Sequence, residues 1–420
     1  MSAIKIGSIV QVFFSDFLSK AFIGAMGILL IRFMSEAEYA HYILALSLVA
    51  VVTQTFSTSF NRIYIVGYQR LNLEYSPSSF LGIQLWGISA LVVLTLPFIS
   101  YLKGNYWFIL ALIIATCLSE FSKTFYQRKL KFFFFSMIEI ARGLVFSCSL
   151  LLLIYIVRHD LKSWQVLFTQ AITLFAVFIL AFHKHLRLSK LLDVTEGTRF
   201  AMGIVKGEYK YLFGYHFILA FFSQVDVFML KSMTSEIELA TYGSAFRYYS
   251  LLLLALSAVH VIILPSIQQI KNFTELESIF KKHKTMLLLF GPLVLIGAWA
   301  SQWIIPWIDM GKYPDAVIVF RILSLSSIIS FAFSPHINLV LRFEDFKFLF
   351  LLIGMTLVLN VGLNMALIPI LGVIGVAIAT LIAFGCVNGS IFLRARKHKQ
   401  KFAITSKSIS RWHRIDDEVV

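Results

Sequence analysis

The chain is a series of long apolar stretches separated by short segments that carry most of the charged and turn-forming residues. A helix needs about 20 apolar residues to cross the hydrocarbon core of a bilayer, and each stretch reaches that length. Apolar residues run on without the alternation typical of barrel strands, so the pattern predicts membrane-spanning helices. The predicted spans are 8–31, 41–66, 79–102, 105–126, 133–157, 163–183, 209–230, 240–265, 285–308, 314–341, 348–370 and 373–393.

Composition excludes most other classes of protein. Of the 420 residues, 59% are hydrophobic and 14% are charged, whereas soluble domains average about 45–50% apolar and about 25% charged residues. A soluble globular protein, a disordered protein, a disulfide scaffold and a coiled coil are therefore excluded. No long stretch of soluble composition remains for a catalytic domain on a membrane anchor. The three cysteines lie in apolar runs and predict no disulfide framework.

The basic residues predict the orientation of the chain. With the N-terminus placed in the cytoplasm, 27 of the 37 Lys and Arg residues fall in inner loops and tails, among them Lys123, and six fall in outer loops. Cytoplasmic loops of membrane proteins carry such an excess, so both termini are expected inside. The net charge of +15 is explained in this way, without a nucleic-acid partner.

An internal repeat predicts two halves. Residues 35–45 (SEAEYAHYILA) and 235–245 (SEIELATYGSA) match at six of eleven positions. Both segments lie in the turn between the first two helices of a six-helix half, so the halves should run parallel. We expect an all-α polytopic membrane protein of about twelve helices, with two parallel six-helix lobes around a central cavity. The expected parts are the N-terminal lobe 1–190, a cytoplasmic linker 191–208, the C-terminal lobe 209–393 and a basic cytoplasmic tail 394–420.

Apart from Arg62, Lys123 and Lys210 near span ends, which are counted with the inner loops, four basic residues lie inside the predicted spans, where a charge costs a few kcal/mol unless it is paired or reaches water. They are Lys20, Arg142, Arg247 and Arg321. One interpretation is structural, since Asp16 and Lys20 are four residues apart and Glu139 and Arg142 three apart, spacings that allow ion pairs on a helix. The other interpretation is a cationic cavity for an anionic substrate such as a phosphate.

Carboxylates in the same spans are candidates for binding a driving ion. Asp16 and Asp226 are the residues we expect to bind a coupling H⁺ or Na⁺.

Four segments resemble a known family of transporters. They are RFMSEAEYAHYILALSL at 32–48, QVDVFMLKSMTSEIELATYGSAFRYYSLL at 224–252, MGKYPDAVIVFRILSLS at 310–326 and LNVGLNMALIPILGVIGVAIATLIAF at 359–384. Together they resemble the polysaccharide (Wzx-type O-antigen) flippases of the multidrug/oligosaccharidyl-lipid/polysaccharide superfamily. The glycines of the family's first turn are replaced here.

The resemblance implies an activity and its partners. It implies a flippase that moves an undecaprenyl-diphosphate-linked oligosaccharide from the cytoplasmic to the outer leaflet of a bacterial inner membrane by alternating access. Lys20, Arg142, Arg247 and Arg321 would then contact the diphosphate, and Asp16 and Asp226 would couple an ion gradient. Membrane lipid and polysaccharide-assembly proteins are the further partners it implies.

Two other functions remain open. A multidrug antiporter of the same superfamily would share the fold, but its organic cations would favour acidic residues in the cavity. A membrane polymerase or ligase for lipid-linked sugars would need a large outer loop, and the longest predicted outer connection has nine residues, 32–40. Motifs for a catalytic triad, a metal site or a phosphate loop are also absent from the sequence. We therefore expect a transporter without a cofactor or metal, rather than an enzyme.

Overall fold

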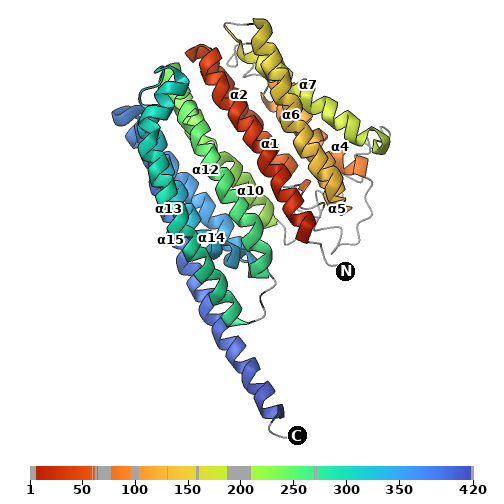
Figure 1. The fold of residues 1–420 in the computed structure, drawn as a ribbon, viewed down its shortest axis with the longest axis vertical. Coiled ribbons are helices and arrows are strands. Elements are labelled where there is room, and N and C mark those ends of the chain that lie inside the picture. Colours follow the sequence, from red (N-terminus) through yellow and green to blue (C-terminus); the bar gives the residue numbers. More distant parts are fainter. Residues whose placement is uncertain are drawn as a thin grey trace. The chain divides into compact units, whose positions relative to one another are not determined.

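The computed structural model describes residues 6–58, 60–61, 64, 77–95, 104–129, 131–157, 160–186, 210–268, 270 and 272–417, and every regular element in these ranges is a helix (Figure 1). The elements are α1 (Ile6–Phe33), α2 (Glu36–Val52), η1 (Thr53–Thr58), α4 (Pro77–Thr95), α5 (Tyr106–Arg128), α6 (Phe132–Val157), α7 (Ser163–Phe182), η3 (His183–His185), α10 (Lys210–Phe222), α11 (Val225–Met233), α12 (Glu236–Gln268), α13 (Phe273–Asp309), α14 (Ala316–Arg342) and α15 (Phe346–Asp417).

These helices confirm the predicted all-helical membrane fold. Each predicted span has a helical counterpart, with α10 and α11 sharing 209–230 and α15 covering the last two spans. Within the described ranges, nine helices are long and apolar enough to cross a membrane. Because lipid leaves no partner for exposed backbone, continuous helices are the expected result.

The last two spans are separated by a sharp reversal at Gly372. Its φ of 54° lies in the left-handed region, which glycine adopts without steric cost. A Cβ on Gly375 would lie 2.5 Å from the carbonyl oxygen of Leu367, whereas eight residues of straight helix would separate the two by about 12 Å. The chain therefore folds back here, at the boundary predicted between spans 348–370 and 373–393.

The chain forms two compact units. The first comprises residues 1–247 with Pro306–Pro314, and the second comprises Tyr248–Ile305 with Asp315–Val420. The first unit thus includes α10, α11 and the start of α12 in addition to the N-terminal helices. The predicted linker 191–208 lies outside the described residues, and the division into two six-helix lobes stays a prediction.

Both copies of the repeat start a helix in the same way, within the first unit. The hydroxyl of Ser35 accepts a hydrogen bond from the Glu38 amide at 3.4 Å, and the hydroxyl of Ser235 accepts one from Glu238 at 3.3 Å. Serine is a favoured residue at this position because it satisfies an amide that the first turn leaves unpaired. Tyr42 and its equivalent, Tyr242, are each 3% exposed. The two segments are equivalent in local structure as well as in sequence.

Close packing of α1 against α6 is set by a glycine. A Cβ on Gly143 would lie 2.9 Å from the Cα atom and 3.0 Å from the carbonyl oxygen of Ser19. Small residues permit such close backbone approach between membrane helices, where packing provides much of the association free energy. The two helices lie side by side in Figure 1.

The Gly143→Ala variant is therefore expected to lose stability. The added methyl group would meet backbone atoms that cannot rotate away, so a loss of roughly 1–3 kcal/mol is expected, as for overpacking in a core. Thermal unfolding of the purified protein, followed by size-exclusion chromatography, measures the effect. Gly362→Ala is the control, because a Cβ there has no described atom within 4 Å. A Gly143→Ala variant as stable as this control would contradict the packing.

Candidate functional site

Four charged side chains form a buried network between α5 and α6 of the first unit. Lys123 contacts Glu139 directly and lies 2.9 Å from Glu120, and Arg142 also contacts Glu120. The contact between Arg142 and Glu139 is longer, 4.0 Å from Nε to Oε2. Glu139 is 2% exposed and Lys123 is 11% exposed. Two acids and two bases balance one another, as groups withdrawn from water require.

This network corrects one expectation from the sequence and extends another. Lys123 is counted there among the basic residues of an inner loop, but it is buried in the last turns of α5. The ion pair that the spacing of Glu139 and Arg142 allows is present, and Arg142 also makes a shorter contact with Glu120, for which the sequence predicts no role. The missed signal was the spacing of three between Glu120 and Lys123, which matches the Glu139–Arg142 spacing on the next helix.

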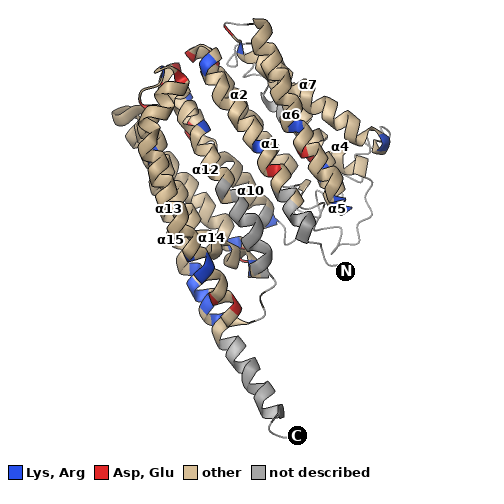
Figure 2. Ribbon diagram, in the orientation of Figure 1, with Lys and Arg blue, Asp and Glu red and all other residues tan. Residues whose placement is uncertain are grey.

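Asp16 and Lys20 form the ion pair expected on α1. The Lys20 ammonium lies 2.6 Å from the carboxylate of Asp16, and both side chains remain partly exposed. Gly143 brings this part of α1 against α6, next to Arg142. The carboxylate of Asp16 interacts electrostatically with Arg142, so the α1 pair adjoins the buried network. Figure 2 shows acidic and basic positions together on these helices.

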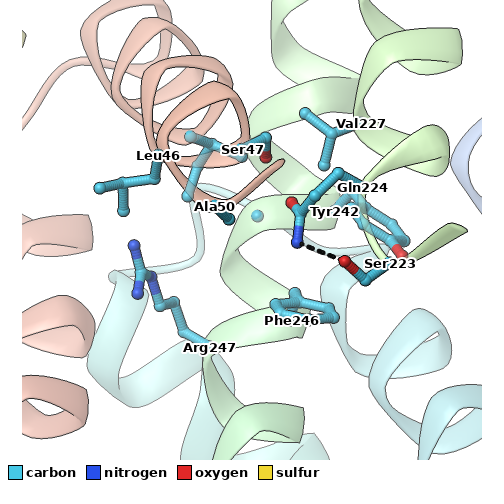
Figure 3. Close-up of a pocket in the computed structure, with 11 residues that line it drawn as sticks. Leu46, Ser47, Ala50, Ser223, Gln224, Val227, Tyr242, Phe246 and Arg247 are labelled. Carbon is cyan, nitrogen blue, oxygen red and sulfur yellow. Dashed lines mark hydrogen bonds between the residues drawn. The ribbon is translucent and has the colours of Figure 1, made fainter. Parts of the chain in front are cut away.

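A cavity of about 170 Å³ lies in the first unit between α2, the α10–α11 turn and the start of α12 (Figure 3). Its polar lining comes from Ser47, Ser223, Gln224, Tyr242 and Arg247, and the rest is apolar. The Gln224 amide donates a hydrogen bond to the Ser223 hydroxyl at 3.3 Å. None of the eleven described residues that line the cavity is Asp or Glu. The amide and guanidinium groups on this wall can donate hydrogen bonds to an anion, whereas the Tyr242 hydroxyl donates to Asp226.

Arg247 lies at the edge of this cavity, and its side chain extends from α12 toward α2 (Figure 3). Its guanidinium carbon lies 5.6 Å from the centre of the Tyr42 ring, and it interacts electrostatically with the hydroxyls of Tyr39 and Tyr42. A Cβ on Gly27 of α1 would lie 3.2 Å from its Cδ atom. Gly27 and the two tyrosines therefore form a slot that fixes where the positive charge is held.

The packing beside the cavity depends on another glycine. A Cβ on Gly243 would lie 2.5 Å from Cγ1 of Ile43. The two residues lie in the two copies of the repeat, so these copies pack directly against each other. On the same helices, His41 lies 3.2 Å from Glu236.

The two remaining candidate residues lie elsewhere. Asp226 is 7% exposed and accepts a hydrogen bond from the Tyr242 hydroxyl at 2.9 Å, but it does not line the cavity. Arg321 belongs to the second unit, where it donates hydrogen bonds to the Ala298 carbonyl at 2.9 Å and to the Gln302 side chain at 3.2 Å. Both of these partners are on α13.

The turn between α13 and α14 contacts the end of α1. The Lys312 ammonium donates to the carbonyl oxygens of Ile31, Arg32 and Met34 at 3.0–3.4 Å. These carbonyls lie where α1 ends and lacks further amide donors, so a lysine there is favourable. Next to it, the rings of Tyr313 and Tyr39 lie 6.2 Å apart. Lys312 therefore joins the α13–α14 turn to the α1–α2 turn.

Comparisons with known proteins identify the fold. No protein-family model matches the chain, and no curated protein matches it. Among solved structures, the chain is similar to a lipid II flippase, MurJ, in an inward closed conformation, with a TM-score of 0.74 and 16% identity over 98% of this chain and 93% of that one. It is also similar to an inward-facing multidrug resistance MATE family transporter of the MOP superfamily, with a TM-score of 0.67 and 13% identity over 92% of this chain and 96% of that one.

A third similar structure is a MOP superfamily transporter from Pyrococcus furiosus with a binding pocket of reverse polarity, with a TM-score of 0.62 and 12% identity over 94% of this chain and 96% of that one. Identities this low show the fold and not the substrate. The chain has the fold of the MOP transporters and is a multi-pass membrane protein.

Proposed function

We propose that the protein is a flippase for a lipid-linked oligosaccharide whose lipid carries a diphosphate, and that it works by alternating access. The observation that carries the proposal is the guanidinium of Arg247, fixed at the edge of a cavity whose described lining combines apolar and polar residues and includes no carboxylate. A fold similarity to a lipid II flippase supports it. Undecaprenyl diphosphate, as in the O-antigen flippases, is the lipid that the sequence resemblance favours.

The size of the cavity indicates which part of the substrate Arg247 would contact. About 170 Å³ accommodates a phosphate group with a few waters but not an oligosaccharide, since ligand pockets for larger molecules measure about 300–1,000 Å³. The site as described can therefore bind the charged group alone. We infer that α2 and α12 separate during transport so that the sugars can pass.

The other candidate residues have three different roles in this proposal: binding the diphosphate, holding helices together and binding a coupling ion. Lys20, with its partly exposed ammonium, is the second residue we assign to the diphosphate. Arg142 and Arg321 are held by Glu120 and by α13, so we assign them a supporting role in keeping helices together. Asp16 and Asp226 remain the proposed sites for a coupling H⁺ or Na⁺.

Separation of α2 and α12 requires that nearby contacts break. The hydrogen bonds of Lys312 to the end of α1 are the clearest of these, since three carbonyl oxygens share one ammonium group. We propose that this contact closes the outer side of the transporter. The assignment of that side as outer rests on the distribution of basic residues, which predicts that both termini are cytoplasmic.

A multidrug antiporter is the second candidate, because several similar solved structures are MATE transporters. Organic cations would be repelled by Arg247 and would find no carboxylate among the described residues of the cavity wall. The polarity of the cavity therefore favours the flippase.

Replacement of Arg247 tests the flippase directly. In cells whose surface glycan depends on this protein, Arg247→Gln is expected to reduce that glycan about 10–100-fold, because a charged hydrogen bond contributes about 1.5–3 kcal/mol. Lipid-linked repeat units should accumulate on the cytoplasmic leaflet, and Arg247→Lys should retain part of the activity. Arg32→Gln is the matched control, since Arg32 is exposed at the end of α1. Full surface glycan with Arg247→Gln at normal protein level would remove Arg247 from the site.

The buried network generates a separate prediction about stability. Lys123→Met leaves Glu139 buried without its main counter-charge, so a loss of about 3–5 kcal/mol is expected, as for a broken buried ion pair. Adding Glu139→Gln removes the stranded charge and should restore most of the loss. Thermal unfolding of the purified variants measures both effects.

Lys131→Met is the control for that series, because Lys131 is exposed and outside the network. It is expected to change stability by less than about 1 kcal/mol. If Lys123→Met were as stable as Lys131→Met, the network would not hold α5 and α6 together.

A further inference from the structure

A second cavity, of about 390 Å³, lies in the second unit where α13, α14 and α15 meet. Its wall combines aromatic rings with charged groups, and it is distinct from the cavity at Arg247. The rings are those of Phe273, Phe280, His336 and Phe392, and the charged residues are Glu277, Arg396 and Lys399.

The cation of Lys399 is held in place by its neighbours. Its ammonium lies 5.5 Å from the ring centre of Phe273 and 5.1 Å from that of Phe280, both on α13. It lies 3.7 Å from the carboxylate of Glu277, which neutralises part of its charge. With Arg396 on the same wall, the lining keeps one net positive charge. The same two helices also carry Lys281, Lys282, Lys284, Lys397 and Lys401.

The cavity lies at the level where α15 changes from apolar to basic. The helix is apolar up to Leu393 and then carries Arg394, Arg396, Lys397, Lys399 and Lys401. Figure 2 shows these basic positions gathered at one end of the unit. Such a boundary marks the membrane surface, where lysine and arginine side chains extend toward the headgroups.

An ion pair fixes this part of α15. Asp345, in the α14–α15 turn, lies 2.5 Å from Arg394 and 3.1 Å from His398. Burial opposes ionisation of Asp345, but hydrogen bonds from Arg394 and His398 outweigh it and lower the pKa of the carboxyl group. The contacts of Asp345 with Arg394 and His398 therefore hold the segment of α15 that carries Arg396 and Lys399 beside α13 and α14.

We propose that this second cavity binds the headgroup of an anionic phospholipid from the cytoplasmic leaflet. The phosphate contacts Arg396 and Lys399, and the first methylene groups of an acyl chain lie on Phe273, Phe280 and Phe392. Net positive charge selects an anionic over a zwitterionic headgroup, since Lys and Arg near the membrane surface attract anionic lipid. The cavity, of about 390 Å³, is large enough for one phospholipid headgroup.

Native mass spectrometry of the purified full chain, titrated with phosphatidylglycerol, tests the proposal. The unmodified protein is expected to retain phosphatidylglycerol at least tenfold more tightly than phosphatidylcholine. The double variant Arg396→Gln with Lys399→Gln should weaken phosphatidylglycerol binding about tenfold or more and leave phosphatidylcholine binding unchanged. A photoreactive phosphatidylglycerol should crosslink to peptides that contain Phe280 or Phe392.

Lys397→Gln is the matched control, because it removes one charge from the same turn of α15 but does not line the cavity. It should bind phosphatidylglycerol within about twofold of the unmodified protein. If Lys397→Gln and Lys399→Gln, tested singly, weakened phosphatidylglycerol binding equally, binding would depend only on the overall charge of this surface. That result would overturn the proposed site. Displacement of phosphatidylglycerol by undecaprenyl diphosphate at lower concentration would also overturn it, by showing that the cavity binds the transported lipid. Unchanged elution on size-exclusion chromatography verifies that each variant is folded.

Discussion

Charge compensation inside the hydrocarbon is the constraint on which the first unit depends. Lys123 and Glu139 are nearly inaccessible, and neither could remain charged at that depth without the other. Arg142 and Glu120 complete the balance and connect α5 to α6. Because Gly143 lets α1 approach α6 closely, the Asp16–Lys20 pair adjoins this balanced group. The ion pairs between α5 and α6 thus neutralise the buried charges and also hold these two helices together.

Arg247 differs from these residues in its surroundings. It is held by the ring of Tyr42, by the hydroxyls of Tyr39 and Tyr42 and by the space above Gly27, next to a small, partly polar cavity. An arginine held in this way stays charged and keeps its position while a ligand enters or leaves. Such preorganisation is what a reversible phosphate site needs, since less freedom is lost when the anion binds.

The fold was largely predictable from the sequence, and the pairing of charges was not. Continuous apolar stretches with charged boundaries predict where the helices lie, and the Gly372 reversal lies where two predicted spans meet. The helix ends are less predictable, since α13 begins at Phe273, before the span predicted at 285–308, and α15 continues to Asp417, beyond the span predicted at 373–393. Helical spacing predicted the Asp16–Lys20 pair, because both residues are on one helix. The Arg142–Glu120 contact joins residues 22 positions apart on neighbouring helices, which helical periodicity alone does not relate. Lys123 was placed in a loop because a lysine near the end of a span usually reaches water. Arg247 stood out as a deep cation, but the slot formed by Gly27, Tyr39 and Tyr42 depends on tertiary packing.

The central claim, that the protein moves a lipid-linked oligosaccharide across a bilayer, is tested most directly by reconstitution. Purified protein in liposomes that contain a fluorescent undecaprenyl-diphosphate oligosaccharide should make the label in the inner leaflet accessible to an outside quencher over time. Arg247→Gln proteoliposomes should behave like protein-free liposomes in the same assay. The account would be contradicted if the unmodified protein moved the lipid no faster than protein-free liposomes do and transported an organic cation instead. That result would favour a multidrug exporter.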